Sequence, residues 1–226
     1  MNTVPGRMLT DPDWLRARIA EMGRSWGTDT PRVGATLWWC MVASALVEPL
    51  ARAYAAGERA PIAQLDRIGC EVRPDGGVDR IVFAVSAAST AEIGSSATGD
   101  LTGAAEDVAE PGVEQSEAAI ALLDTLAAAI AQVAAVSGAR APALWAVVAD
   151  AIGNRAIDAG VPEAGARLAA EIGGRLPAPR FVEVGNRTFV RRISCCLVYE
   201  VPGCQMCTSC PKRPKADREK LLADLT

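Results

Sequence analysis

Five of the seven cysteines in this chain of 226 residues lie within sixteen positions of one another. Cys195 and Cys196 are adjacent, ten residues separate Cys196 from Cys207, and two residues separate Cys207 from Cys210. A Cys-x-x-Cys turn can direct two sulfurs at one metal ion, and four thiolates complete the ligand shell of a [2Fe–2S] cluster, a [4Fe–4S] cluster or a structural zinc ion. Adjacent cysteines in a strand would face opposite ways, so both can bind one centre only if the backbone turns between them.

The order of these cysteines resembles the C-terminal [2Fe–2S] signature of the FhuF-type ferric siderophore reductases. The sequence "RRISCC", which ends at Cys196, resembles that family's run of two arginines, two residues and two cysteines. The sequence "ALWAVVADAI" around Trp145 resembles a helix of the same family. The resemblance covers about the last forty residues together with this helix.

This resemblance implies that Cys195, Cys196, Cys207 and Cys210 ligate one [2Fe–2S] cluster. It also implies an iron–sulfur oxidoreductase of iron uptake, which passes one electron to a ferric siderophore and releases Fe²⁺ in the cytoplasm. Cys204 departs from the family pattern, and we interpret it as a bystander that could substitute for a neighbouring ligand. No side chain is assigned a catalytic role, because this electron transfer requires no proton transfer by a side chain.

The electron donor is expected to be a separate protein such as a ferredoxin. No G-x-G-x-x-G follows a strand, and no Walker A loop is present, so no nicotinamide or nucleotide site is expected. Basic residues surround the cysteines, and we expect them to favour the reduced cluster and to attract an acidic donor. Of these, we interpret Arg218 and Lys220 as parts of a solvated tail. The full set is Arg187, Arg191, Arg192, Lys212, Arg213, Lys215, Arg218 and Lys220.

Three other interpretations compete with the reductase. A structural zinc knuckle would make the protein a non-enzymatic, zinc-stabilised interaction module. A reversible disulfide sensor would need fewer than five thiols. A siderophore synthetase is disfavoured because the chain has no histidine, which also excludes Ser–His and Cys–His nucleophiles and histidine-ligated zinc, haem and Rieske centres.

The composition predicts a soluble protein of the cytoplasm. Half of the residues are hydrophobic, and the net charge of −4 gives no reason to expect nucleic-acid binding. The apolar run 33–47 is shorter than the ~20 residues of a membrane span, and the run 118–136 carries Asp124 and Gln132, which predicts a buried helix. No transmembrane segment is expected, although a peripheral membrane contact stays open. Cytoplasmic cysteines are normally reduced, which favours metal or redox chemistry over structural disulfides.

The elements that must position the cysteines are mostly helical. Helices are expected from Asp11 or Asp13 to about Met22, from Pro31 to about Ala56 with a kink or division at Pro49, and over 114–136, 142–159 and 162–172. Hairpins are expected around residues 75–77 and 185–186, and a short helix after the cysteines. Cys40 and Cys70 are interpreted as buried apolar residues. At least one of Trp38 and Trp39 belongs to the core, and the other is a candidate for lining a ligand groove.

The predicted fold class is α+β: a mainly helical domain with two β-hairpins and a small cysteine-rich iron–sulfur appendage at the C-terminus. We place the helical domain at residues 1–176 and the [2Fe–2S]-binding region at residues 177–226. The segment 86–112 is rich in Ala, Ser, Thr, Gly and acidic residues. Such a composition buries little apolar area, so we interpret this segment as a mobile loop.

Overall fold

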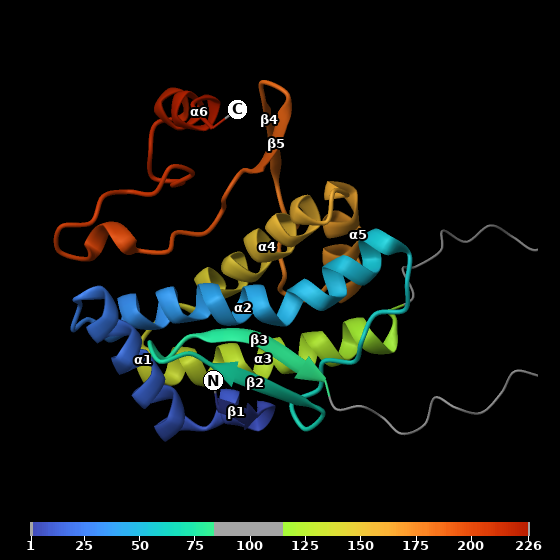
Figure 1. Cartoon of the computed structure of the whole chain (residues 1–226), viewed down its shortest axis with the longest axis vertical. Coiled ribbons are helices and arrows are strands. Elements are labelled where there is room, and N and C mark those ends of the chain that lie inside the picture. The colour runs from blue at the N-terminus through green and yellow to red at the C-terminus, as the bar shows by residue number, and fades with distance from the viewer. Residues whose placement is uncertain (1, 84–114, 226) are drawn as a thin grey trace, which may run out of the picture.

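Five helices form the body of the protein in the computed structural model, which describes residues 2–83 and 115–225 (Figure 1). They are α1 (Pro12–Trp26), α2 (Pro31–Ala56), α3 (Glu117–Ser137), α4 (Ala141–Asp158) and α5 (Pro162–Ile172). Their starts follow from the sequence. The side chain of Asp11 accepts a hydrogen bond from the backbone N–H of Trp14 at 2.7 Å, and Ser116 accepts one from Ala119 at 3.2 Å. The predicted helices are therefore confirmed, with shifts of a few residues at their ends.

Helix α2 is the centre of the core. It is apolar nearly all round, as expected for a helix that is covered on every side. Trp38 and Trp39 are both completely buried. The indole N–H of Trp38 donates to the carbonyl of Gly76 at 2.9 Å, and that of Trp39 donates to the carbonyl of Leu144 at 3.0 Å. Both tryptophans are therefore core residues that tie α2 to its neighbours, and neither lines a groove.

The sequence predicted that Pro49 would kink or divide α2, and the helix is not divided. The helix continues without interruption from Pro31 to Ala56, with Pro49 inside it. Leu46, Val47 and Leu50 around the proline are fully buried. Proline has no N–H, so α2 loses one backbone hydrogen bond at this position. The packing of the buried residues on both sides of the proline offsets this loss.

The first sheet has three antiparallel strands in the order β1 (Asn2–Pro5), β2 (Ile68–Val72) and β3 (Val78–Phe83). The predicted hairpin of β2 and β3 is confirmed, and Cys70 is buried at its centre. Strand β1 was missed because it has only four residues and ends in a proline. Its edge position tolerates that proline, since the missing N–H costs no ladder bond there.

The C-terminal part lies at one end of the helical body, far from the N-terminus (Figure 1). It contains the hairpin of β4 (Phe181–Val184) and β5 (Arg187–Val190), a short 3-10 helix at Val198–Glu200, and α6 (Lys215–Ala223). The predicted second hairpin and terminal helix are therefore confirmed. Between β5 and α6 the chain carries all five clustered cysteines without any strand.

The fold class is confirmed as mainly helical with small antiparallel sheets and a cysteine-rich C-terminal part. The predicted loop 86–112 lies outside the described residues. By length and composition alone, α2 and α3 could each cross a membrane, and 44% of the most apolar window of α3 is buried inside the protein. In α2, 72% of the most apolar window is buried inside the protein, as in the core helix of a soluble protein.

Candidate iron–sulfur site

The chain turns sharply directly after the adjacent cysteines. Leu197 has a φ of 63°, the left-handed conformation, and is the one residue other than glycine with a positive φ in the described part of the chain. This conformation costs roughly 1 kcal/mol for a residue with a side chain. The turn starts the 3-10 helix at Val198–Glu200 and is closed by the N–H of Glu200, which donates to the carbonyl of Leu197 at 2.9 Å. The backbone therefore leaves an extended path here, as two adjacent ligands require.

Four of the thiols lie close enough to one another to interact as two pairs. Cys195 is paired with Cys210, and Cys196 is paired with Cys207. Electrostatic contacts also connect Cys195 with Cys196 and Cys207 with Cys210. Each of the four thiols that the sequence singled out therefore has two of the others as neighbours.

The two cysteines of the central pair differ in their pKa. The hydrogen bond from the Cys207 thiol, helped by the backbone N–H of Val198 and by Arg192, holds the pKa of Cys196 well below that of an ordinary thiol. The same bond raises the pKa of Cys207, because its proton is shared with the Cys196 thiolate. Burial raises the pKa of Cys195, although the N–H of Leu197 partly opposes this effect. The site therefore already favours one thiolate.

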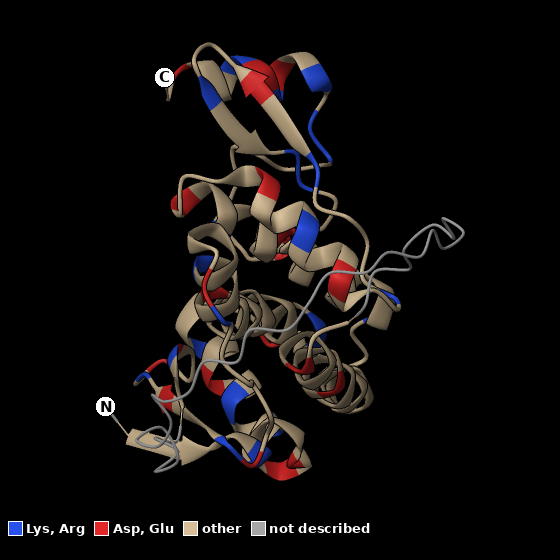
Figure 2. Cartoon of the chain, turned by 90° about the vertical axis from the view of Figure 1, so that its right-hand side faces the viewer, with Lys and Arg blue, Asp and Glu red and all other residues tan. Residues whose placement is uncertain are grey.

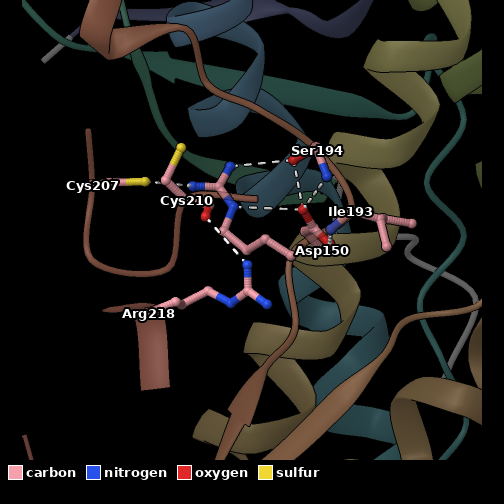
Figure 3. Close-up of polar contacts among 7 residues, drawn as sticks. Asp150, Ile193, Ser194, Cys207, Cys210 and Arg218 are labelled. Carbon is pink, nitrogen blue, oxygen red and sulfur yellow. Dashed lines mark hydrogen bonds and ion pairs between the residues drawn. The ribbon is translucent and has the colours of Figure 1, made fainter. Parts of the chain in front are cut away.

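Asp150 on α4 fastens the segment before the cysteines to the helical body (Figure 3). Its carboxylate is 3% exposed and accepts hydrogen bonds from the backbone N–H of Ile193 at 3.0 Å and of Ser194 at 2.9 Å. It also accepts from the Ser194 hydroxyl at 2.6 Å and pairs with Nε of Arg192 at 3.5 Å. These contacts satisfy a buried charge that would otherwise be costly, and they fix the segment two residues before Cys195.

Arg192 connects this anchor to the thiols. Its Nη1 lies 3.7 Å from Sγ of Cys207, and its Nη2 donates to the Ser194 hydroxyl at 3.2 Å. Burial lowers the pKa of Arg192, but Cys40, Cys196 and Asp150 together raise it above its ordinary value. The guanidinium therefore stays charged beside the sulfurs.

A second anchor holds the far side of the cysteine segment. Arg32 on α2 forms an ion pair with Glu200 at 2.5 Å. The Cys207–Cys210 turn is closed by the N–H of Cys210, which donates to the carbonyl of Cys207 at 3.1 Å. Nε of Arg213 donates to the same carbonyl at 3.0 Å. Hydrogen bonds and one ion pair therefore hold both cysteine-bearing segments.

The remaining three cysteines differ from these four. Cys204 packs against the hydrophobic core, and within the described residues it takes no part in the contacts among the four thiols. Cys70 is buried in the first sheet, and burial raises its pKa to about 12. Cys40 on α2 is half-buried and lies near Arg192 and Cys196, and burial raises its pKa to about 12 as well. Cys40 thus borders the site, which nothing in the sequence indicated.

The donor set contains the four thiols that a two-iron cluster requires. Within the residues that the structure describes, no three Cys, Asp or Glu side chains converge tightly enough to hold one ion. Two adjacent pairs of thiols are instead what a [2Fe–2S] cluster requires, since each iron takes two thiolates. Backbone N–H groups of Leu197 and Val198 already reach the sulfurs of Cys195 and Cys196, and such bonds are typical of iron–sulfur sites.

Sequence reasoning missed Asp150 and misplaced Arg218. Asp150 lies on the same helix as Trp145. A single acidic residue in an apolar helix does not by itself indicate a role in a site. Arg218 does not belong to a solvated tail: it is half-buried, and its Nη1 reaches the carbonyl of Cys210 at 3.5 Å (Figure 3). Helix α6 folds back toward the cysteines and carries it there.

Comparison with known proteins agrees with this geometry. Residues 192–212 match the FhuF 2Fe-2S C-terminal domain. No curated protein and no solved structure shows a detectable match to the chain. The predicted resemblance and the predicted [2Fe–2S] cofactor are confirmed for this segment, which contains all four paired cysteines.

Proposed function

We propose that this protein, whose C-terminal segment is a FhuF-type 2Fe-2S domain, is a cytoplasmic ferric siderophore reductase. In this proposal Cys195, Cys196, Cys207 and Cys210 hold the cluster, and a ferric siderophore is the substrate. Bound by these thiolates, a [2Fe–2S] cluster supplies one electron at a time. The observation that carries the proposal is the pairing of the four thiols inside the matched segment.

One electron suffices for the proposed reaction. Siderophores hold Fe³⁺ through hard oxygen donors, and Fe²⁺, with its lower charge density, binds the same donors much more weakly. Reduction therefore converts a tight complex into a labile one without acid–base catalysis. The absence of histidine from the chain is compatible with such chemistry.

The chain's own residues prepare the site for this role. Arg192 places a positive charge 3.7 Å from the Cys207 sulfur, which favours the form of the site that carries the extra electron. Cys195, Cys196 and Cys207 are only half-buried, so a donor or a substrate can approach closely. Asp150 and the Arg32–Glu200 pair hold the chain on both sides of Cys195 and Cys196 in place, which limits the rearrangement that accompanies a change of charge.

A single-turnover experiment tests the proposal. Protein reduced anaerobically with dithionite and freed of excess reductant is mixed with a panel of intact ferric siderophores, in the presence of a ferrous chelator. We expect the visible absorbance of the cluster to return and the ferrous chelate to appear in equal amounts with at least one siderophore. Uncomplexed ferric salts are a poor control, because most low-potential clusters reduce them. If a ferredoxin reoxidises the protein but no siderophore does, the protein is an electron carrier for another reaction.

A further inference from the structure

An arginine-lined cavity opens beside the paired thiols. Its volume is about 410 Å³, and four of its six lining residues are arginines. The complete lining is Arg180, Arg191, Arg192, Ile193, Pro211 and Arg218. A smaller cavity of about 120 Å³ shares Arg191 and Arg218 and adds Lys215. Figure 2 shows Lys and Arg gathered where the C-terminal part meets the helical body.

The positive charge of this cavity is largely uncompensated. Arg180 and Arg191 are exposed, and among the described residues neither forms an ion pair with a carboxylate. Arg192 shares its charge with Asp150, and Arg218 reaches only backbone carbonyls, at 3.4 and 3.5 Å. Glu219 borders the smaller cavity but pairs with Lys215 at 3.6 Å. Like charges held this close repel one another, so an anion in the cavity would be stabilised.

The chemistry of the lining indicates oxygen anions. Guanidinium groups present planar pairs of N–H donors that match carboxylate and other oxyanions, and they are less strongly hydrated than an ammonium group. The volume lies within the roughly 300–1,000 Å³ typical of small-molecule sites. The cavity is open to solvent, so it can receive one face of a bound complex.

The cavity lies directly against the candidate cluster ligands. Ile193 is two residues before Cys195, and Pro211 directly follows Cys210. Arg192 lines the cavity and also reaches the Cys207 sulfur. A complex seated here would therefore contact both cysteine-bearing segments, which is where an electron acceptor has to be.

We propose that this cavity binds one face of anionic ferric complexes and so selects their class. This inference rests on the proposed function. Three singly charged hydroxamates cancel the charge of Fe³⁺, whereas three doubly charged catecholates leave the complex with three negative charges. The arginines therefore favour catecholate and other anionic siderophores over neutral trihydroxamates, by attraction that falls with ionic strength.

Gallium complexes test binding apart from electron transfer, because Ga³⁺ has the charge of Fe³⁺ but is not reduced under these conditions. The cluster-loaded protein is titrated calorimetrically with a gallium tris-catecholate and with a gallium trihydroxamate. We expect at least tenfold tighter binding of the tris-catecholate, and at least a tenfold loss of this affinity in the double variant Arg180→Gln, Arg191→Gln. The double variant Arg7→Gln, Arg67→Gln changes the net charge equally at exposed positions outside the cavity lining and should keep the affinity.

Three results would overturn the inference. The first is equal affinity for both gallium complexes, and the second is an equal loss of affinity for the tris-catecholate in both double variants. The third is that an acidic ferredoxin reduces the Arg180→Gln, Arg191→Gln variant more slowly while its gallium binding is unchanged. The last would assign the cavity to the electron donor. Mixing the reduced protein with both ferric complexes separates this inference from the proposed function. Reoxidation by the trihydroxamate supports the reductase, and the gallium titration alone decides the selectivity, because doubly charged catecholates stabilise Fe³⁺ more strongly and make it harder to reduce. If neither ferric complex reoxidises the reduced protein, the proposed reductase function is contradicted, whatever the affinities for the gallium complexes.

Discussion

At the scale of single residues, the contacts of Arg192 decide how the site treats charge. Its guanidinium lies between the Asp150 carboxylate and the Cys207 sulfur. Two unit charges about 4 Å apart interact by about 1 kcal/mol in water and by about 4 kcal/mol near a protein surface. A residue three positions before the first candidate ligand can therefore adjust the redox equilibrium without binding metal.

Replacement of Arg192 by glutamine should make the reduction potential of the protein more negative, because the positive charge beside Cys207 is lost. A spectroelectrochemical titration measures this shift. Arg175→Gln, at an exposed position outside the arginine cavity, serves as the charge-matched control and should leave the potential unchanged. An unchanged potential in Arg192→Gln would show that this arginine serves the fold alone.

The four paired cysteines should differ sharply from Cys204. Cys207→Ser or Cys210→Ser removes one of four thiolates, so we expect most of the bound iron and sulfide to be lost. Cys204→Ser should keep nearly all of the bound iron and sulfide, because Cys204 packs against the core and does not belong to either pair of thiols. Iron and acid-labile sulfide assays on anaerobically purified variants measure the difference. Loss of the cluster from Cys204→Ser together with its retention in Cys195→Ser would disprove the ligand set.

Asp150→Asn should destabilise the protein by about 2–3 kcal/mol, because an amide cannot replace a buried carboxylate that faces four donors. Thermal or denaturant unfolding measures this loss. Asp158→Asn lies on the same helix, where Asp158 is 60% exposed and paired with Arg155, and it should cost less than 1 kcal/mol. Equal effects of the two substitutions would refute the anchoring role of Asp150.

At the scale of elements, α2 and α4 form the platform on which the cysteine segment rests. Helix α4 supplies Asp150, and α2 supplies Arg32 and Cys40. Gly153 lets α4 and the C-terminal hairpin approach closely, because a Cβ there would lie 3.0 Å from the Val190 side chain. Strand β5 then leads directly into Arg191 and Arg192, so the hairpin's seat on α4 also fixes where the cysteine segment begins.

Trp39→Phe tests this platform. It removes the indole N–H that joins α2 to the Leu144 carbonyl of α4 and leaves a small void in a fully buried position. We expect a loss of about 1–2 kcal/mol in the free energy of unfolding. Trp26→Phe, at a position that is 43% exposed, should have almost no effect. A similar stability for both variants would contradict the central place of the α2–α4 contact.

The elements were largely predictable, because their signals are local. Asp11, Pro31 and Gly173 mark helix ends, and Gly185-Asn186 marks a hairpin turn. Strand β1 was not, because it depends on a partner strand that is distant in the sequence. The sequence also left open whether Pro49 kinks or divides α2, and the helix is not divided. The cysteine spacing predicted the cluster, yet Asp150 and Cys40 come to the site only through the packing of α4 and α2.

At the scale of the whole molecule, the helical body carries a redox appendage at one end (Figure 1). The body supplies the anchors, while the C-terminal part supplies the thiols and all of the lining residues of the basic cavity. Half-buried cysteines at one end of the molecule are accessible first to an electron donor and then to an electron acceptor. The predicted boundary between residues 176 and 177 stays a prediction.

The central claim is that the four paired thiols hold a one-electron [2Fe–2S] centre. Electron paramagnetic resonance of the anaerobically purified protein tests it most directly, with iron, sulfide and zinc assayed in the same sample. We predict a protein that is silent as purified and gives the signal of one unpaired electron per chain after dithionite, with iron and sulfide in equal amounts. A colourless protein that contains stoichiometric zinc and gives no signal after reduction would contradict the claim and indicate a zinc-stabilised interaction module.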